Sequence, residues 1–196
     1  MSVTARERLD GKPARRESLL AAADLVVQRD GASASMASIA AEAGITKPIL
    51  YRHFGDKRGL YAALAERHTD RLLDALVEAL TAGGPPRQRV LRTIDVYLAT
   101  IEEQPQVYRF LMQSDDAAPG PVRGFLSRLQ ELLAAGIVHE LHLDDHDVRS
   151  KVWAAGIVGM VQVAGDMWLE TGLMPRAELS DQLTSLLWGA YGAAAQ

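Results

Sequence analysis

Cysteine is absent from this chain of 196 residues. A disulfide framework, a thiolate-ligated zinc or iron–sulfur centre and a cysteine nucleophile are therefore excluded. Aromatic residues make up only 6% of the chain, whereas alanine and leucine are plentiful, and this composition favours helices over sheets. The apolar fraction of 48% and the charged fraction of 23% are typical of a soluble globular protein.

Long hydrophobic runs are also missing. The most apolar stretch, Val152–Gly165, contains Gln162 and is shorter than the roughly 20 apolar residues that span a bilayer. The N-terminal sequence MSVTARERLDGKPARR carries charge, but the apolar segment of a secretory signal does not follow it. We therefore expect a soluble, cytoplasmic protein that has no membrane partner.

Positive charge is scarce overall, since the formal net charge is −4, but it is unevenly distributed. Residues 1–58 hold 10 Lys and Arg against 7 Asp and Glu, whereas the remainder holds 11 against 18. A basic head on an acidic body predicts that only the head meets an anionic partner.

Apolar residues recur at helical spacing along almost the whole chain, and no strand-like alternation persists. The predicted fold class is therefore all-α. Capping residues, glycines and prolines predict one helix that stops at Gly31, followed by helices over 35–44, 46–55, 56–80, 87–103, 106–114, 120–141, 145–171 and 176–192. We expect a three-helix head over residues 1–56, with a flexible tail at 1–13, and a larger helical body over residues 57–196.

The segment Ser35–Phe54 has the pattern of a helix-turn-helix. Ser35 opens its first helix as N-cap, and the helix buries an apolar stripe formed by Met36, Ile39, Ala40 and Ala43. Gly44 has the backbone freedom that a sharp turn requires. Ile45 follows as an apolar contact between the two helices.

The second helix of this segment has two different faces. Thr46 can cap it, and Leu50 and Phe54, four residues apart, face inward, which leaves Lys47, Pro48, Tyr51 and Arg52 on the outside. A short helix with a basic and aromatic outer face suits a reader of the DNA major groove. The turn alone leaves open the alternative of a helical hairpin with a solvated charged face.

The stretch from Leu19 to Leu64 resembles the N-terminal domain of TetR-family transcriptional regulators. The resemblance is carried, in order and spacing, by Ala22-Ala23, Gly31, Ser35, Ile39-Ala40, Ala43-Gly44, Leu50-Tyr51, His53-Phe54, Lys57 and Leu60. It implies a homodimeric, ligand-responsive protein that binds double-stranded DNA, usually as a repressor. A symmetric dimer predicts an inverted-repeat operator.

Carried over by position, the resemblance implies a set of DNA-binding residues: Ser35, Ala37, Thr46, Lys47, Pro48, Tyr51, Arg52, His53 and Lys57. Within this set, Tyr51, His53 and Lys57 match positions that contact the DNA backbone, and the start of the helix at Ser35 offers N–H groups to a phosphate. Two positions depart from the family pattern. Ala37 replaces a longer polar residue, and Ile49 replaces a small or hydroxyl residue, so the operator sequence is not predicted.

The resemblance also implies a ligand chamber and a dimer surface in the body. The candidate ligand-binding residues are Ile94, Tyr97, Leu98, Ile101, Tyr108, Leu111, Phe125, Leu129, Trp153, Met160 and Trp168, which suit a small apolar or amphipathic ligand. The candidate dimer residues are Gly156, Gly159, Leu183, Leu187 and Tyr191. Both sets could instead pack only within the core of a monomer.

Other chemistry has weaker support in the sequence. The histidines at 139, 142 and 146 lie among aspartates, but no ligand geometry is implied, and Asp144 or Asp145 is better explained as a helix N-cap. No catalytic motif has the required sequence context. We therefore expect that the protein is not an enzyme and that it binds neither a cofactor nor a metal ion. The alternative function is an all-helical small-molecule or lipid carrier, or an enzyme, that does not bind DNA.

Overall fold

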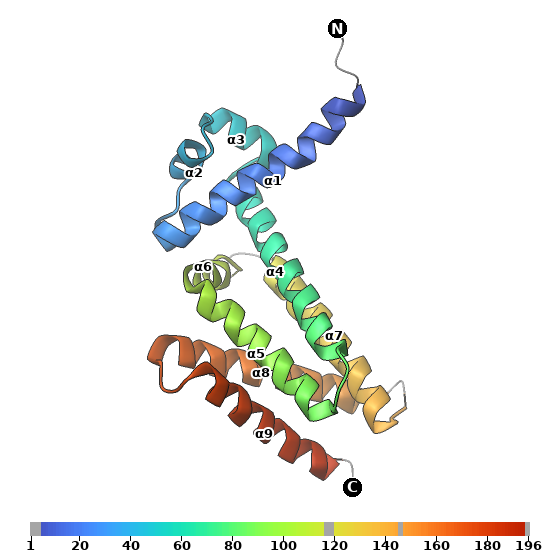
Figure 1. The fold of residues 1–196 in the computed structure, drawn as a ribbon. Coiled ribbons are helices and arrows are strands. Elements are labelled where there is room, and N and C mark those ends of the chain that lie inside the picture. The colour runs from blue at the N-terminus through green and yellow to red at the C-terminus, as the bar shows by residue number, and fades with distance from the viewer. Residues whose placement is uncertain (1–4, 116–119, 145–146, 195–196) are drawn as a thin grey trace. The chain divides into compact units, whose positions relative to one another are not determined.

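The computed structural model describes residues 5–115, 120–144 and 147–194 (Figure 1). Within these residues the elements are nine α-helices and one short 3-10 helix, without a strand, so the predicted all-α fold is confirmed. Contacts divide the chain into unit 1, Met1–His68 with Gln104–Val122, and unit 2, Thr69–Glu103 with Arg123–Gln196. These units differ from the predicted domains 1–56 and 57–196, because α6 packs against α1 within unit 1.

Unit 1 contains α1 (Ala5–Asp30), η1 (Gly31–Ser33), α2 (Met36–Glu42), α3 (Lys47–Phe54), the first turns of α4 (Lys57–Thr81) and α6 (Pro105–Asp115). Its core is built from the apolar stripe of α1, with Leu19, Ala23 and Val26 fully buried, together with Ile39 and Leu50. The segment that was expected to be a flexible tail is helical from Ala5 onward, although it contains Gly11 and Pro13, which disfavour a helix.

A buried polar cluster ties α1 to α4 inside unit 1. Asp24 of α1 is 8% exposed, and its Oδ1 lies 2.5 Å from Nε2 of His68. Its Oδ2 lies 3.2 Å from Nη1 of Arg67, whose Nη2 forms a second ion pair with the exposed Glu17. Two successive residues of α4 thus hold the two oxygens of one carboxylate.

Unit 2 contains the rest of α4 with α5 (Pro86–Glu103), most of α7 (Pro121–Leu141), α8 (Val148–Thr171) and α9 (Arg176–Ala194). Helix α5 passes close to α8 at Gly165, where an added Cβ would lie 3.1 Å from the Tyr97 ring and 3.2 Å from Ile101. Polar contacts join α9 to α5, since Asp95 accepts hydrogen bonds from Arg176 and Ser180.

Apart from the early start of α1, the helix limits agree with the predicted ones to within about two residues, except at the start of α8. The cap is neither Asp144 nor Asp145: Asp147 is the N-cap, and its Oδ1 accepts a 2.9 Å hydrogen bond from the Arg149 N–H. Asp145 itself lies outside the described residues. Neighbouring aspartates carry the same capping signal, and the chain uses the last of them. Gly172 ends the helix with a φ of 59°.

Helix α8 is longer than its most apolar stretch suggested. By length and composition alone, Val148–Thr171 could cross a membrane, although apolar helices of globular proteins meet the same criterion. One side of it is covered within unit 2, where Ala154, Val158 and Trp168 are buried. Its other side is described below with the candidate dimer residues.

Candidate nucleic-acid interface

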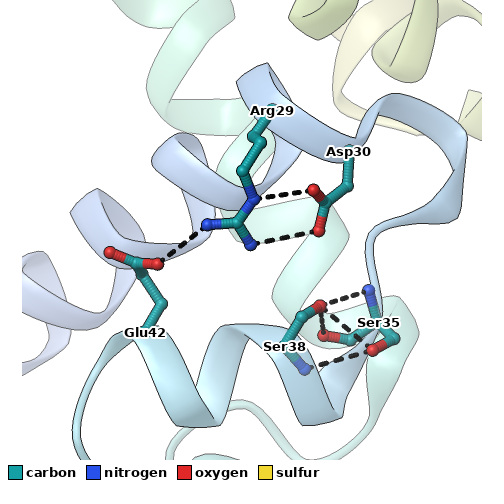
Figure 2. A network of polar contacts seen from close by, with 5 residues as sticks. All are labelled: Arg29, Asp30, Ser35, Ser38 and Glu42. Carbon is teal, nitrogen blue, oxygen red and sulfur yellow. Dashed lines mark hydrogen bonds and ion pairs between the residues drawn. The ribbon is translucent and has the colours of Figure 1, made fainter.

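A reciprocal pair of serine hydrogen bonds sets the start of α2 (Figure 2). Ser35 is the N-cap, and its Oγ accepts a 3.1 Å hydrogen bond from the Ser38 N–H. In return, the Ser38 Oγ accepts a 3.0 Å hydrogen bond from the Ser35 N–H. The predicted cap is confirmed, and it is a capping box in which serine takes the position usually held by Glu or Gln.

An arginine bridges the ends of α1 and α2 beside this box (Figure 2). Arg29 donates from Nε and Nη2 to the two oxygens of Asp30 and from Nη1 to Oε2 of Glu42, at 2.7, 3.2 and 3.2 Å. The hydrogen bonds to Asp30 raise the pKa of Arg29 and lower the pKa of Asp30. Because the Arg29 side chain is 58% exposed, the bridge orients α2 rather than adding much stability.

The turn and α3 follow the sequence pattern closely. Gly44 has a φ of 63°, and Leu50 and Phe54 are buried on the inner side of α3. Thr46 occupies the N-cap position, but its side chain makes no capping hydrogen bond. Pro48 in the first turn has no N–H, so the helix has one donor fewer to cap.

The outer face of α3 is open to solvent. Lys47, Pro48, Tyr51 and Arg52 are all exposed, and Tyr51 keeps 42% of its surface. The Tyr51 ring is therefore not packed into the core of its own unit. His53 is half-buried, and its ring lies 6.4 Å from the Phe54 ring. Ala37, on α2, is exposed as well.

The start of α4 is equally well defined. The predicted cap is confirmed, since the Asp56 Oδ1 accepts a 2.7 Å hydrogen bond from the Gly59 N–H. A Cβ at Gly59 would lie 2.0 Å from the carbonyl oxygen of Phe54, so only glycine fits there. Lys57 is exposed, and its Nζ lies 5.0 Å from the ring of Tyr61, a residue that the sequence analysis did not single out.

The candidate ligand-binding residues are divided between the units. Tyr108 and Leu111 lie on α6 in unit 1, and the other nine lie in unit 2. In unit 2, Ile94, Leu98, Ile101, Phe125 and Trp168 are buried, and Tyr97, Leu129, Trp153 and Met160 are half-buried. Burial is consistent with either a chamber lining or ordinary core packing.

A cleft of about 650 Å³ is present in unit 2, but at another place. It lies between α4, α5 and α9, and its lining includes Ala79, Arg92, Asp95 and Arg176. None of the candidate ligand-binding residues lines it. Sequence reasoning missed this cleft because its lining combines four alanines with charged residues from three separate helices, which form no local ligand pattern.

The candidate dimer residues lie beside an exposed apolar stripe on α8. Gly156 is exposed and Gly159 half-buried, and they continue a series of exposed side chains on the same face: Val148, Val152, Val163 and Met167. On α9, Leu183 is buried, Leu187 is half-buried and Leu186 is 62% exposed. The Tyr191 side chain lies outside the described residues.

The candidate histidine cluster is not assembled in the described part of the chain. His139 lies in the last turn of α7, His142 has a φ of 51°, and His146 lies outside the described residues. Among the residues that the structure describes, no group of three His, Cys, Asp or Glu side chains could hold a metal ion.

Comparison with known proteins matches an N-terminal and a C-terminal part of the chain. Residues 19–64 match the family of bacterial regulatory proteins described as tetR family, and residues 75–196 match a tetracyclin repressor-like C-terminal domain. An uncharacterized HTH-type transcriptional regulator of Mycobacterium tuberculosis H37Rv is 34% identical over 184 residues, covering 91% of this chain and 78% of the relative. The HTH-type transcriptional activator FasR of Mycolicibacterium smegmatis is 29% identical over 164 residues, covering 83% and 75%.

Solved structures agree over the whole chain. A TetR-family transcriptional regulator from Streptomyces coelicolor superposes with a TM-score of 0.78 at 26% identity, covering 100% of this chain and 85% of that one. A TetR-like regulator from Rhodococcus sp. RHA1 gives a TM-score of 0.68 at 29% identity, covering 91% and 96%. The helix-turn-helix has a solvent-exposed outer face, and family models match both the N-terminal and the C-terminal part of the chain. This chain therefore belongs to the TetR family of transcriptional regulators.

Proposed function

We propose that this regulator reads a specific DNA sequence with the outer face of α3. The observation that carries the proposal is the two-sided character of that helix. Leu50 and Phe54 anchor its inner side, while Lys47, Tyr51 and Arg52 are exposed on the other. A basic and aromatic helix face that is held rigidly from behind suits hydrogen bonding to base edges in the major groove.

The residues around α3 are proposed to hold the protein on the DNA backbone. Lys57 is exposed at the first position of α4, next to α3 in the chain, and an ammonium there suits a phosphate oxygen. His53, in the last turn of α3, is proposed as a second backbone contact. The Ser35 hydroxyl is already bonded within the capping box, so its role is to fix the start of α2.

The functional unit is proposed to be a homodimer that pairs through α8 and α9. Two observations support this: the exposed apolar stripe of α8, where Val152 and Val163 each keep 68% of their surface, and the 62% exposed Leu186 on α9. Exposed apolar patches of this kind mark protein interfaces. Such a dimer would bind an inverted repeat whose half-sites lie about one helical turn apart, roughly 34–36 Å.

The regulator is further proposed to act in the cytoplasm as a repressor that a small apolar or amphipathic molecule releases from its operator. Of the eleven candidate positions, the nine that lie in unit 2 on α5, α7 and α8 are proposed to bind the ligand, with Tyr97 as their polar anchor. The related FasR carries the name of an activator. Whether this regulator represses or activates is tested with a reporter gene placed under the operator that DNA selection identifies.

Selection of fragments from random-sequence DNA by the purified protein tests the central proposal. We expect an inverted repeat to be enriched, and the variants Lys47→Ala and Tyr51→Ala to lose about 1–3 kcal/mol of binding free energy per half-site. Arg123→Ala removes an exposed cation from α7 and serves as the matched control. Unchanged affinity in both α3 variants, or binding without sequence preference as in a carrier, would contradict the proposal.

A further inference from the structure

Tyr61 is a half-buried residue in the second turn of α4 at which three contacts meet. Its hydroxyl group and its ring together meet three different segments of unit 1. These segments are the residue before the α2 cap, the first turn of α4, and α6.

The hydroxyl contact concerns the start of α2. Tyr61 donates a 3.0 Å hydrogen bond to the carbonyl oxygen of Ala34, which is 2% exposed. Ala34 immediately precedes Ser35, the residue whose capping box with Ser38 begins α2. The hydrogen bond therefore joins α4 to the point at which the helix-turn-helix starts.

The ring contact concerns the DNA backbone. The Lys57 ammonium lies 5.0 Å from the centre of the Tyr61 ring, one helical turn away. Such a cation–π contact restricts where a long, flexible side chain points without neutralising its charge. Lys57 is exposed and is the proposed phosphate contact at this end of α4.

The third contact comes from α6. The rings of Tyr61 and Phe110 are 4.5 Å apart and meet edge to face at 81°, and Phe110 is 5% exposed. Helix α6 also lies against η1, directly after α1, since a Cβ at Gly31 would be 3.0 Å from Oε1 of Gln106. The orientation of the Tyr61 ring thus depends on where α6 packs.

We propose that Tyr61 is a positioning residue for DNA recognition. It fixes the position of Lys57 relative to the start of α2, and α6 determines the orientation of the Tyr61 ring through Phe110. This inference rests on the proposed function, since Lys57 matters only if the protein binds DNA. A purely structural Tyr61 would affect stability alone. A positioning Tyr61 also changes how DNA affinity depends on salt.

The test uses the full chain and a DNA fragment selected from a random pool. Tyr61→Phe removes only the hydroxyl, so we expect about fivefold weaker binding, the effect of one hydrogen bond, with an unchanged salt slope. Tyr61→Leu removes the ring, so the slope of log K against log salt should become shallower by about one per protomer. Lys57→Ala should change the slope equally, and adding Tyr61→Leu to it should change the slope no further. Independent, additive slope changes would overturn the proposal.

A second cycle examines α6. In the Phe110→Leu background the Tyr61 ring is no longer fixed, so Tyr61→Phe should weaken DNA binding less than twofold instead of about fivefold. Thr93→Val, which removes a hydroxyl hydrogen bond to the Arg89 carbonyl on α5, is the matched control and should leave DNA affinity unchanged. An equal effect of Tyr61→Phe in both backgrounds refutes the role of α6.

Hydrogen exchange of the free protein gives a readout that needs no DNA. Tyr61→Phe should speed exchange of the Ser38 amide about fivefold, because the start of α2 loses its tie to α4. Thr93→Val should not alter this exchange. If the wild-type protein selects no DNA, the proposed function fails. If it selects DNA while Tyr61→Phe changes neither affinity nor Ser38 exchange, this inference alone fails.

Discussion

Replacing Asp24 with alanine should remove the tie between α1 and α4. The carboxylate is 8% exposed, and its oxygens contact Nε2 of His68 at 2.5 Å and Nη1 of Arg67 at 3.2 Å. The side chains of both partners are also largely covered, at 16% and 14% exposure. Without Asp24, the ion pair that remains to Arg67 among the described residues is the one with Glu17, whose side chain is 56% exposed.

The expected cost follows from this burial. Removing one partner of a buried ion pair costs about 3–5 kcal/mol, mainly because the remaining charge is left uncompensated. The cluster is not completely sealed, so the lower end of that range, about 3 kcal/mol of unfolding free energy, is expected. Asp24→Asn keeps the size of the side chain and one acceptor oxygen, and it should cost less than Asp24→Ala.

Urea unfolding at a fixed protein concentration measures this difference. Asp70→Ala is the matched control, since Asp70 is also a paired aspartate, with its Oδ1 2.8 Å from Nη2 of Arg128, but both side chains of that pair are more than half exposed. An exposed pair contributes at most about 1 kcal/mol. Equal losses in the Asp24→Ala and Asp70→Ala variants would show that burial does not determine the strength of the cluster.

Three further predictions concern unit 2. Val163→Asp places a charge in the exposed stripe of α8, so sedimentation velocity should detect monomers at micromolar concentration; a persistent dimer would place the interface elsewhere. Hydrogen bonds from Arg149 lower the pKa of Asp147, so the cap of α8 is present above the usual carboxyl pKa of about 4 and is lost as the pH falls through the lowered value, which faster exchange of the Arg149 amide would report. Gly165→Ala should cost about 1 kcal/mol in thermal or urea unfolding, because the new Cβ would lie 3.1 Å from the Tyr97 ring and 3.2 Å from Ile101 and both side chains would have to shift, whereas Gly136→Ala, with open space around it, should be neutral or stabilising.

Much of the candidate interface could be predicted because its signals are local. Ser35, Gly44 and Asp56 act on backbone groups within three or four residues of themselves, so their capping and turning roles could be read in order along the chain. The inward and outward faces of α3 follow from the helical period alone. Thr46 shows the limit of such signals, since the right residue stands at the N-cap position without making the capping bond.

The choice among equivalent local signals required the structure. Neighbouring aspartates precede α8, and only the path of the chain after α7 selects Asp147 as its cap. The stripe of α8 is similar, because periodicity does not tell a core face from an exposed one. The exposure of Val152 and Val163 shows which side unit 2 leaves uncovered.

By itself, the sequence determined that this chain is all-helical, where most of its helices begin and end, and that its head has the pattern of a helix-turn-helix. These properties depend on hydrogen bonds and periodicities within a few residues. Only the tertiary structure decided that α6 packs with the head, that Asp24 meets Arg67 and His68, and that Tyr61 meets Ala34. Tyr61 and Ala34 are 27 positions apart, and Asp24 and His68 are 44 positions apart. The partners in such contacts are selected by the packing of whole helices, which no local pattern encodes.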